Sequence, residues 1–264
     1  MKRDRRGANA AAGNPSFIVR FAKGCNLHLM THCKMKRWGF LIAAAALATA
    51  LISGHVAAQA DAELPLNARF LVAARNADAD GMARALREGA AIDSRNRLGE
   101  SALIIVLKKG RVDLAATLIT AGANVNQPAI NGLTPLMVSA YNGDTDLVRQ
   151  LLDRGADVSA VDRLQKNAMT YAAAEGRAEV VRLLLAHGVD ANAVYNNDLT
   201  ALMWAAGYGR TETVQLLLSA GADPAHKDNR GKTALDIARE ENHAATVAVL
   251  EQASPASTRA TTPR

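Results

Sequence analysis

The sequence predicts an all-α solenoid built from stacked helix–turn–helix repeats. Glycine recurs every 33 residues, at Gly89, Gly122, Gly155, Gly188 and Gly221. Other columns keep the same interval, and the clearest of them holds Ser101, Thr134, Asn167, Thr200 and Thr233. A fixed period of this length is typical of repeat architectures, in which each copy packs only on its neighbours.

The first helix of each copy should begin directly after the Ser, Thr or Asn column. These side chains accept a hydrogen bond from an unpaired backbone N–H group at a helix start. Pro135 follows Thr134 and fits the first helical position, where its missing N–H group costs nothing. We expect this helix to run from Pro135 to about Asn142 and to end at Gly143, because glycine readily adopts a left-handed cap conformation.

The second helix of each copy should carry a buried apolar ridge. Its first turn holds Asp or Glu, which complements the helix dipole. Helical spacing is shown by Leu147, Val148, Leu151 and Leu152, and Gly155 closes the helix. Neither helix is long enough to be stable alone in water, so stability must come from contacts between copies. Close stacking is permitted by the small residues Ala172, Ala173, Ala205 and Ala206.

These motifs resemble the ankyrin repeat. The resemblance is carried by Thr134-Pro135-Leu136, Gly143, Leu151-Leu152 and Gly155-Ala156-Asp157, and again by Thr200 to Ala206 with Gly221-Ala222-Asp223. It covers about residues 63–252, as six copies joined by turn or hairpin fingers. The family's usual His after the Leu supports the turn, so we expect less rigid turns where it is replaced by Ile104, Met137, Thr170, Met203 and Asp236.

The two ends of the repeat array are atypical. In the first copy Ala68 stands where a capping residue belongs, and we expect Asn67 to substitute for it. In the last copy Glu240, Glu241 and Glu251 give the polar outer face that a terminal repeat needs. Residues 253–264 are rich in Ser, Thr, Pro and Ala and are expected to form a disordered tail.

Residues 35–60 have the pattern of a secretory signal peptide. Met35-Lys36-Arg37 precedes an apolar stretch that ends at Ile52, and Ala58 with Ala60 predicts cleavage after Ala60. The stretch is short for a spanning helix, which needs about 20 residues. Residues 1–34 are either an extension upstream of a true start at Met35 or a long n-region. An uncleaved leader that anchors the chain in the membrane is a further alternative.

Composition argues against nucleic-acid binding. The formal net charge of +6 comes from the leader, because residues 1–60 hold 9 of the 31 Lys and Arg but 1 of the 25 Asp and Glu. The remaining chain shows no basic stripe with stacking aromatic residues. Both cysteines, Cys25 and Cys33, precede the cleavage site, so the mature chain has no thiolate ligand and needs no disulfide, which suits an oxidising exported compartment.

The sequence contains no recognisable catalytic motif, and we expect neither enzyme activity nor a cofactor. The mature chain has three histidines, and each falls at a different position of the 33-residue repeat: His187, His226 and His243. Neither an HExxH motif nor a Gly-x-Ser-x-Gly motif occurs. An enzyme would need a site assembled between repeats. Trp204 and Tyr171 occupy one column of the first helix and are interpreted as core residues.

The family resemblance implies that turn tips and the exposed side of the inner helices hold partners. Leu98, Leu133, Leu164 and Leu199 would form an exposed apolar line rimmed by polar groups, unless they fold back to pack the turns. Tyr141 and Tyr208 would add aromatic anchors. The predicted partner-binding residues are Arg97, Leu98, Lys108, Leu133, Tyr141, Asn142, Leu164, Lys166, Asn197, Leu199, Tyr208 and Arg230.

Together these observations predict a non-catalytic scaffold, exported to the periplasm, that binds another protein through its concave face and turn tips. The short Ala-rich signal resembles bacterial ones. We expect a monomer that contacts the membrane only during export and binds no nucleic acid. The alternatives are a secreted effector that binds a host protein and a purely structural protein that associates with itself.

Overall fold

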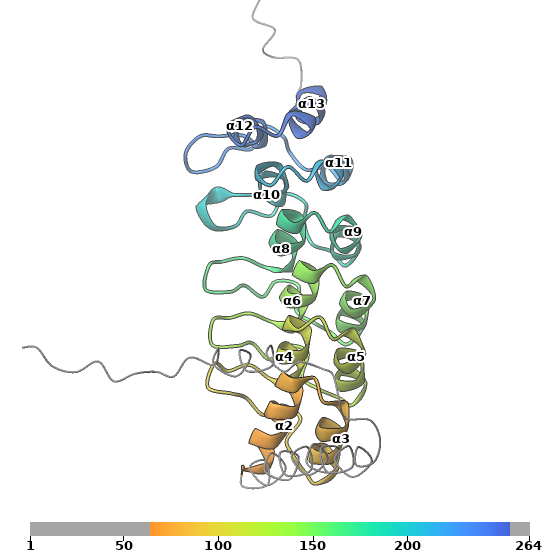
Figure 1. Cartoon of the computed structure of the whole chain (residues 1–264). Coiled ribbons are helices and arrows are strands. Elements are labelled where there is room, and N and C mark those ends of the chain that lie inside the picture. Colours follow the sequence, from red (N-terminus) through yellow and green to blue (C-terminus); the bar gives the residue numbers. More distant parts are fainter. Residues whose placement is uncertain (1–63, 254–264) are drawn as a thin grey trace, which may run out of the picture. The chain divides into compact units, whose positions relative to one another are not determined.

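The computed structural model describes residues 64–253, and these form six consecutive pairs of α-helices (Figure 1). The first helix of each pair is called the inner helix: α2 (Leu66–Asn76), α4 (Ala102–Lys108), α6 (Pro135–Asn142), α8 (Ala168–Glu175), α10 (Ala201–Gly207) and α12 (Ala234–Glu240). The second is called the outer helix: α3 (Ala79–Arg87), α5 (Val112–Thr120), α7 (Thr145–Asp153), α9 (Ala178–Ala186), α11 (Thr211–Ser219) and α13 (Ala244–Ala253).

Each pair packs on the next, so the inner helices form one column and the outer helices a second (Figure 1). Long turns extend from the inner column on the side away from the outer helices. The all-α repeat solenoid expected from the 33-residue period is therefore confirmed. The leader segments 1–34 and 35–60, and the tail beyond Ala253, lie outside the described residues. None of the helices within residues 64–253 has the length and apolarity needed to cross a membrane.

The predicted helix caps are present. In the five inner helices from α4 to α12, the side chain of the Ser, Thr or Asn column accepts the backbone N–H of the third helical residue. Helix α6 runs from Pro135 to Asn142, and Gly143 follows it with φ of 87°. These contacts satisfy N–H groups that a helix leaves unpaired at its first turn.

Two of the residues that replace the usual His make capping contacts of their own. Thr170 and Asp236, which replace the usual His, complete capping boxes with Asn167 and Thr233. Each pair of side chains satisfies two backbone donors reciprocally, which fixes the entry of the chain into the helix.

The prediction that Asn67 caps the first helix is wrong. Pro65 occupies the cap position of α2 and makes no side-chain hydrogen bond there. Asn67 instead lies inside α2, and its Oδ1 accepts the backbone N–H of Ala91 at 2.8 Å. The side chain therefore bridges from α2 to the turn that leads out of the first copy.

The core lies between the two helix columns and continues from copy to copy. A column of leucines on the outer helices is buried throughout, at Leu118, Leu151, Leu184, Leu217 and Leu250. Facing them, the small residues of the inner helices are fully buried, at Ala140, Ala172, Ala173, Ala205 and Ala206. The small side chains let the helices approach closely while the leucines fill the space between copies.

A second column of side chains bonds each inner helix to the following copy. The donors reach the last carbonyl groups of the preceding inner helix, which have no partner within that helix. Arg177 Nε donates to Tyr141 O at 3.1 Å and Arg210 Nε to Ala174 O at 2.8 Å. Arg111 and His243 occupy the same repeat position and donate to Ala77 O and Gly207 O.

Candidate binding surface

Three of the turns that project from the inner helices are held by an acidic or amide side chain, and two of these side chains, Asp162 and Asp228, are buried. Asp162 is 7% exposed, and its carboxylate accepts the backbone N–H groups of Leu164 and Lys166 and the hydroxyl of Tyr171, which lies at 2.7 Å. Burial, followed by this hydrogen bond to Asp162, raises the pKa of the Tyr171 phenol. Asp228 and Asn96 hold their own turns in the same way. Sequence reasoning missed this role, although the three residues are spaced by two repeat lengths.

Neighbouring turns are also bonded to each other through their backbones. Ile130 N donates to Leu98 O at 2.9 Å, and Arg163 N donates to Asn131 O at 2.9 Å. The same contact recurs from Asn229 N to Asn197 O at 3.1 Å. Backbone bonds therefore join the first three turn tips to one another and the last two to each other. A partner could contact several tips of either group at once.

The predicted line of four exposed leucines is wrong in part. Leu98 and Leu164 are 62% and 61% exposed, whereas Leu133 and Leu199 pack against the core. Leu133 and Leu199 lie two residues later in the 33-residue repeat than Leu98 and Leu164 do. At that position the side chain folds back under the turn. In those two turns the exposed apolar side chains are Ile130 and Val194 instead.

An aromatic row, comprising Tyr141, Tyr171, Trp204 and Tyr208, crosses three successive inner helices, α6, α8 and α10. The rings of Tyr141 and Tyr171 meet edge to face, with centroids 6.2 Å apart. Those of Trp204 and Tyr208 stack, also 6.2 Å apart and inclined by 16°. Tyr141 and Tyr208 are 48% and 51% exposed, as expected for anchors.

Lys166 joins the two aromatic pairs. Its Nζ lies 4.2 Å from the ring centroid of Trp204 and 5.8 Å from that of Tyr171. An ammonium group over an aromatic face is attracted by the ring quadrupole. The cation therefore binds the face of Trp204 on one side and that of Tyr171 on the other, making the row continuous.

The core interpretation of Trp204 and Tyr171 is only half right. Both side chains pack against the core, but both stay half-buried and take part in the aromatic row. The indole N–H of Trp204 is buried and has no hydrogen-bond partner within residues 64–253. Sequence spacing placed both residues on the inner helix, but it could not show which side of each ring would be covered.

Other predicted binding residues already have intramolecular partners. Asn142 Nδ2 donates to Leu107 O at 2.9 Å, so its amide connects two copies. Lys108 pairs with Glu100, and the Arg230 guanidinium pairs with Asp228 at 2.7 Å. Asn197 accepts the side-chain amide of Asn229. Among the predicted residues, Arg97 remains exposed, with no side-chain partner in the described residues.

A cavity of about 320 Å³ adjoins the aromatic row between α10 and α12. Its apolar wall is formed by Leu199, Met203 and Ile237, and Trp204 and Tyr208 contribute their rings. Arg230 and Glu241 form its polar side. The cavity could receive an apolar side chain of a partner that lies along the row.

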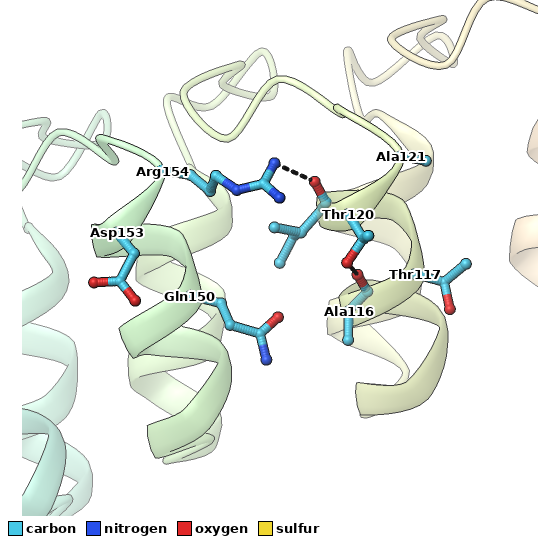
Figure 2. Close-up of a pocket in the computed structure, with 8 residues that line it drawn as sticks. Ala116, Thr117, Thr120, Ala121, Gln150, Asp153 and Arg154 are labelled. Atoms are coloured by element: carbon cyan, nitrogen blue, oxygen red, sulfur yellow. Dashed lines mark hydrogen bonds between the residues drawn. The ribbon is translucent and has the colours of Figure 1, made fainter.

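A second cavity, of about 720 Å³, lies between the outer helices α5 and α7 (Figure 2). Gln150 and Arg154 point from α7 toward α5, and Asp153 points away. Arg154 Nη1 donates to Ile119 O at 2.8 Å and so connects the two copies. This gap between stacked helices presents small and polar side chains and no convergent reactive groups.

The three histidines of the repeat array bond to backbone carbonyl groups. His187 Nδ1 lies 2.8 Å from Leu183 O, and His226 Nε2 lies 3.0 Å from Asp198 O. Residues 64–253 contain no cluster of three or more side chains able to hold a metal ion. The structure therefore brings together a recognition surface and no constellation of catalytic groups within that range.

Comparison with family models identifies the repeats. The model described as Ankyrin repeats (3 copies) matches residues 70–162, 117–194 and 169–258, which together cover more than half of the chain. A search of curated proteins gave no significant match. Ankyrin repeats are protein–protein interaction modules, and the six stacked helix pairs agree with the match. The chain therefore belongs to the ankyrin repeat family.

Proposed function

We propose that this chain is a non-catalytic scaffold that binds another protein along the aromatic row and the adjoining turn tips. The observation that carries the proposal is the row itself. Residues 64–253 contain six aromatic side chains, and four of them lie in this one row. Aromatic residues are enriched among the side chains that dominate binding energy at protein interfaces.

Exposure of the row favours recognition over packing. Tyr141 and Tyr208 are about half exposed, and neither ring is needed to fill the core. Tyrosine supplies a large contact area with few rotatable bonds, so it loses little conformational entropy when a partner orders it. The connected turn tips add backbone and polar groups beside the rings.

The test is capture of the partner by the chain and by a double variant. Tyr141→Ala with Tyr208→Ala should weaken binding by about 100-fold, because each truncation of an interface anchor costs at least about 1 kcal/mol and often 2. Arg182→Ala with Gln215→Ala is the matched control, since both residues are exposed on outer helices. Partners captured from a periplasmic extract would be purified and titrated by calorimetry, with circular dichroism to check helical content.

Equal affinity of the tyrosine double variant and the parent chain for the captured protein would overturn the proposal. So would an equal loss in the outer-helix control. The expected result is a loss confined to the tyrosine variant at unchanged helical content.

We further propose that the scaffold acts in the periplasm after cleavage of residues 1–60. The support is the signal-like segment Met35 to Ala60 in the sequence. Osmotic shock should release a chain whose N-terminal residue is Asp61. Recovery from the culture supernatant would favour a secreted effector, and an uncleaved chain in the membrane fraction would favour an anchored protein.

A further inference from the structure

We propose that the partner segment recognised by the aromatic row is acidic, and that one of its carboxylates binds Lys166. The inference rests on the proposed function and adds the chemistry of the partner. It also assigns Lys166, with its two aromatic neighbours, as the residue that selects for this charge.

The first support is a surplus of donors at the centre of the row. The Lys166 ammonium lies over Trp204, and no hydrogen-bond acceptor contacts its Nζ within residues 64–253. The indole N–H of Trp204 also lacks a partner there, but it is buried, so a carboxylate from outside would bind Lys166 and not the indole. The neighbouring Asp162 carboxylate forms no ion pair with Lys166, and it already accepts the Tyr171 hydroxyl and two backbone N–H groups. A carboxylate from outside would supply the missing acceptor.

The second support is charge complementarity along the turn tips. The five tips, residues 95–100, 128–133, 161–166, 194–199 and 227–232, hold seven Lys and Arg against four Asp and Glu. Two of the four acids, Asp162 and Asp228, are buried and bonded within their turns. A third, Glu100, is paired with Lys108. On the basic side, Arg230 is paired with Asp228 and Lys232 with Glu240. The charged side chains at the tips that have no ion pair within residues 64–253 are then Asp198 and five basic residues, Arg95, Arg97, Arg163, Lys166 and Lys227. The potential that a partner meets at the tips is therefore positive, which favours an acidic segment and disfavours a basic one.

The third support is the cavity beside Trp204. Trp204 belongs both to the cation–π contact and to the cavity of about 320 Å³ whose apolar wall is Leu199, Met203 and Ile237. A segment with Asp or Glu close to a large apolar residue could bind Lys166 and fill this cavity at the same time. A lone anion would bind Lys166 but leave the cavity unfilled.

The experiment is selection of a phage-displayed library of random dodecapeptides on the full chain. The background variant carries Trp38→Phe, which leaves Trp204 as the only tryptophan, so binding can be followed by its emission. Lys166→Met removes the ammonium and keeps the length of the side chain. Arg149→Met is the control, because it also removes one exposed positive charge but from outer helix α7, away from the turn tips and the aromatic row.

We expect peptides selected on the parent chain to be enriched in Asp or Glu next to a large apolar residue. Lys166→Met should weaken the best synthetic peptide by about tenfold, as should replacement of its acidic residue by Gln, and the two changes together should cost no more than either alone. Arg149→Met should leave the affinity and the Trp204 emission change intact. This non-additivity would identify a direct contact, which a purely structural role of Lys166 would not produce.

Two results would overturn the inference in distinguishable ways. If selected peptides lose binding in the Tyr141→Ala and Tyr208→Ala variant but are neutral or basic, or if their acidic residue is uncoupled from Lys166, the chemistry is wrong and the proposed function stands. If no peptide binds, or if binding ignores the tyrosine variant, the inference and the proposed recognition surface both fail.

Discussion

Two glycines that follow helices share a backbone conformation but differ in their surroundings. Gly143 has φ of 87° and Gly155 has φ of 76°. A Cβ atom at Gly143 would lie 2.6 Å from Cδ of Arg177, whereas a Cβ at Gly155 would meet nothing within 4 Å. Gly143 is therefore constrained by both its dihedral angle and its neighbour, and Gly155 only by its dihedral angle.

This contrast gives a prediction for stability. Replacement of either glycine by Ala should cost about 1–2 kcal/mol of unfolding free energy from the left-handed conformation alone. Gly143→Ala should cost more than Gly155→Ala, because it displaces the Arg177 side chain that bonds to Tyr141 O. Urea unfolding of both variants, alone and with Arg177→Ala, checks this. Equal losses in the presence of Arg177 would contradict the steric explanation.

Asp228 should make the stability of the last turn depend on pH. Burial opposes its ionisation, but bonds from Lys232 N–H and from the side chain and backbone of Arg230 outweigh burial and lower its pKa below 3.8. A carboxylate whose pKa is lower in the folded chain stabilises it above the unfolded pKa, and this stabilisation disappears as pH falls through the folded pKa.

We therefore predict that Asp228→Asn is less stable than the parent chain at neutral pH. The gap should stay constant down to about pH 5 and narrow as the pH falls below the unfolded pKa of about 3.9. It should close only below the lower folded pKa, where both chains carry a neutral side chain. Unfolding free energies measured across this range provide the check. A gap that persists in acid would show that shape, and not charge, explains the role of Asp228.

For single residues, the sequence predicted local roles such as helix capping better than it predicted which neighbours from other copies would cover a side chain. The capping column could be predicted because a cap is a local contact between residues three apart. The position of Trp204 between core and surface could not, because Lys166, which covers its ring, comes from the turn of the preceding copy. For the same reason Asn142 was predicted to bind a partner, although its amide is bonded to Leu107 O.

Between elements, side-chain amides fasten one copy to the next. Asn126 Nδ2 donates to Gly155 O at 2.8 Å, and its Oδ1 accepts Asp157 N–H at 2.8 Å. Asn192 repeats both contacts with Gly221 and Asp223. The Asn124 side chain, by contrast, bonds only within its own turn, where its Oδ1 accepts the Asn126 N–H.

Asn126→Ala should therefore destabilise the array more than Asn124→Ala. We expect a loss of about 2 kcal/mol for the two bonds of Asn126 and about half of that for the single bond of Asn124. Denaturant unfolding measures both losses, and hydrogen exchange should show faster opening of the turn after α7 in Asn126→Ala only. Equal losses and equal exchange would show that these bonds do not fasten the copies.

Helix bounds were predictable to within a residue where caps and glycines mark both ends, as in α6. The turns were less predictable, because their exposed apolar residue shifts from Leu98 to Ile130, Leu164 and Val194 along the array. This shift follows the conformation of each turn, which the 33-residue spacing alone does not specify.

Across the repeat array, stability and recognition depend on the same stacking. Each helix pair contacts only its neighbours, so the array coheres through contacts between adjacent copies. The aromatic row takes its residues from three successive copies and exists only when these are stacked. The central claim is that a partner protein lies along this row.

In-cell photocrosslinking tests that claim most directly. Benzoylphenylalanine would be placed at Tyr208 on the aromatic row in one chain and at Gln215, exposed on α11, in another. The account predicts a discrete protein adduct from position 208 and none from position 215. Adducts from position 215 alone, or equal adducts from both positions, would contradict it.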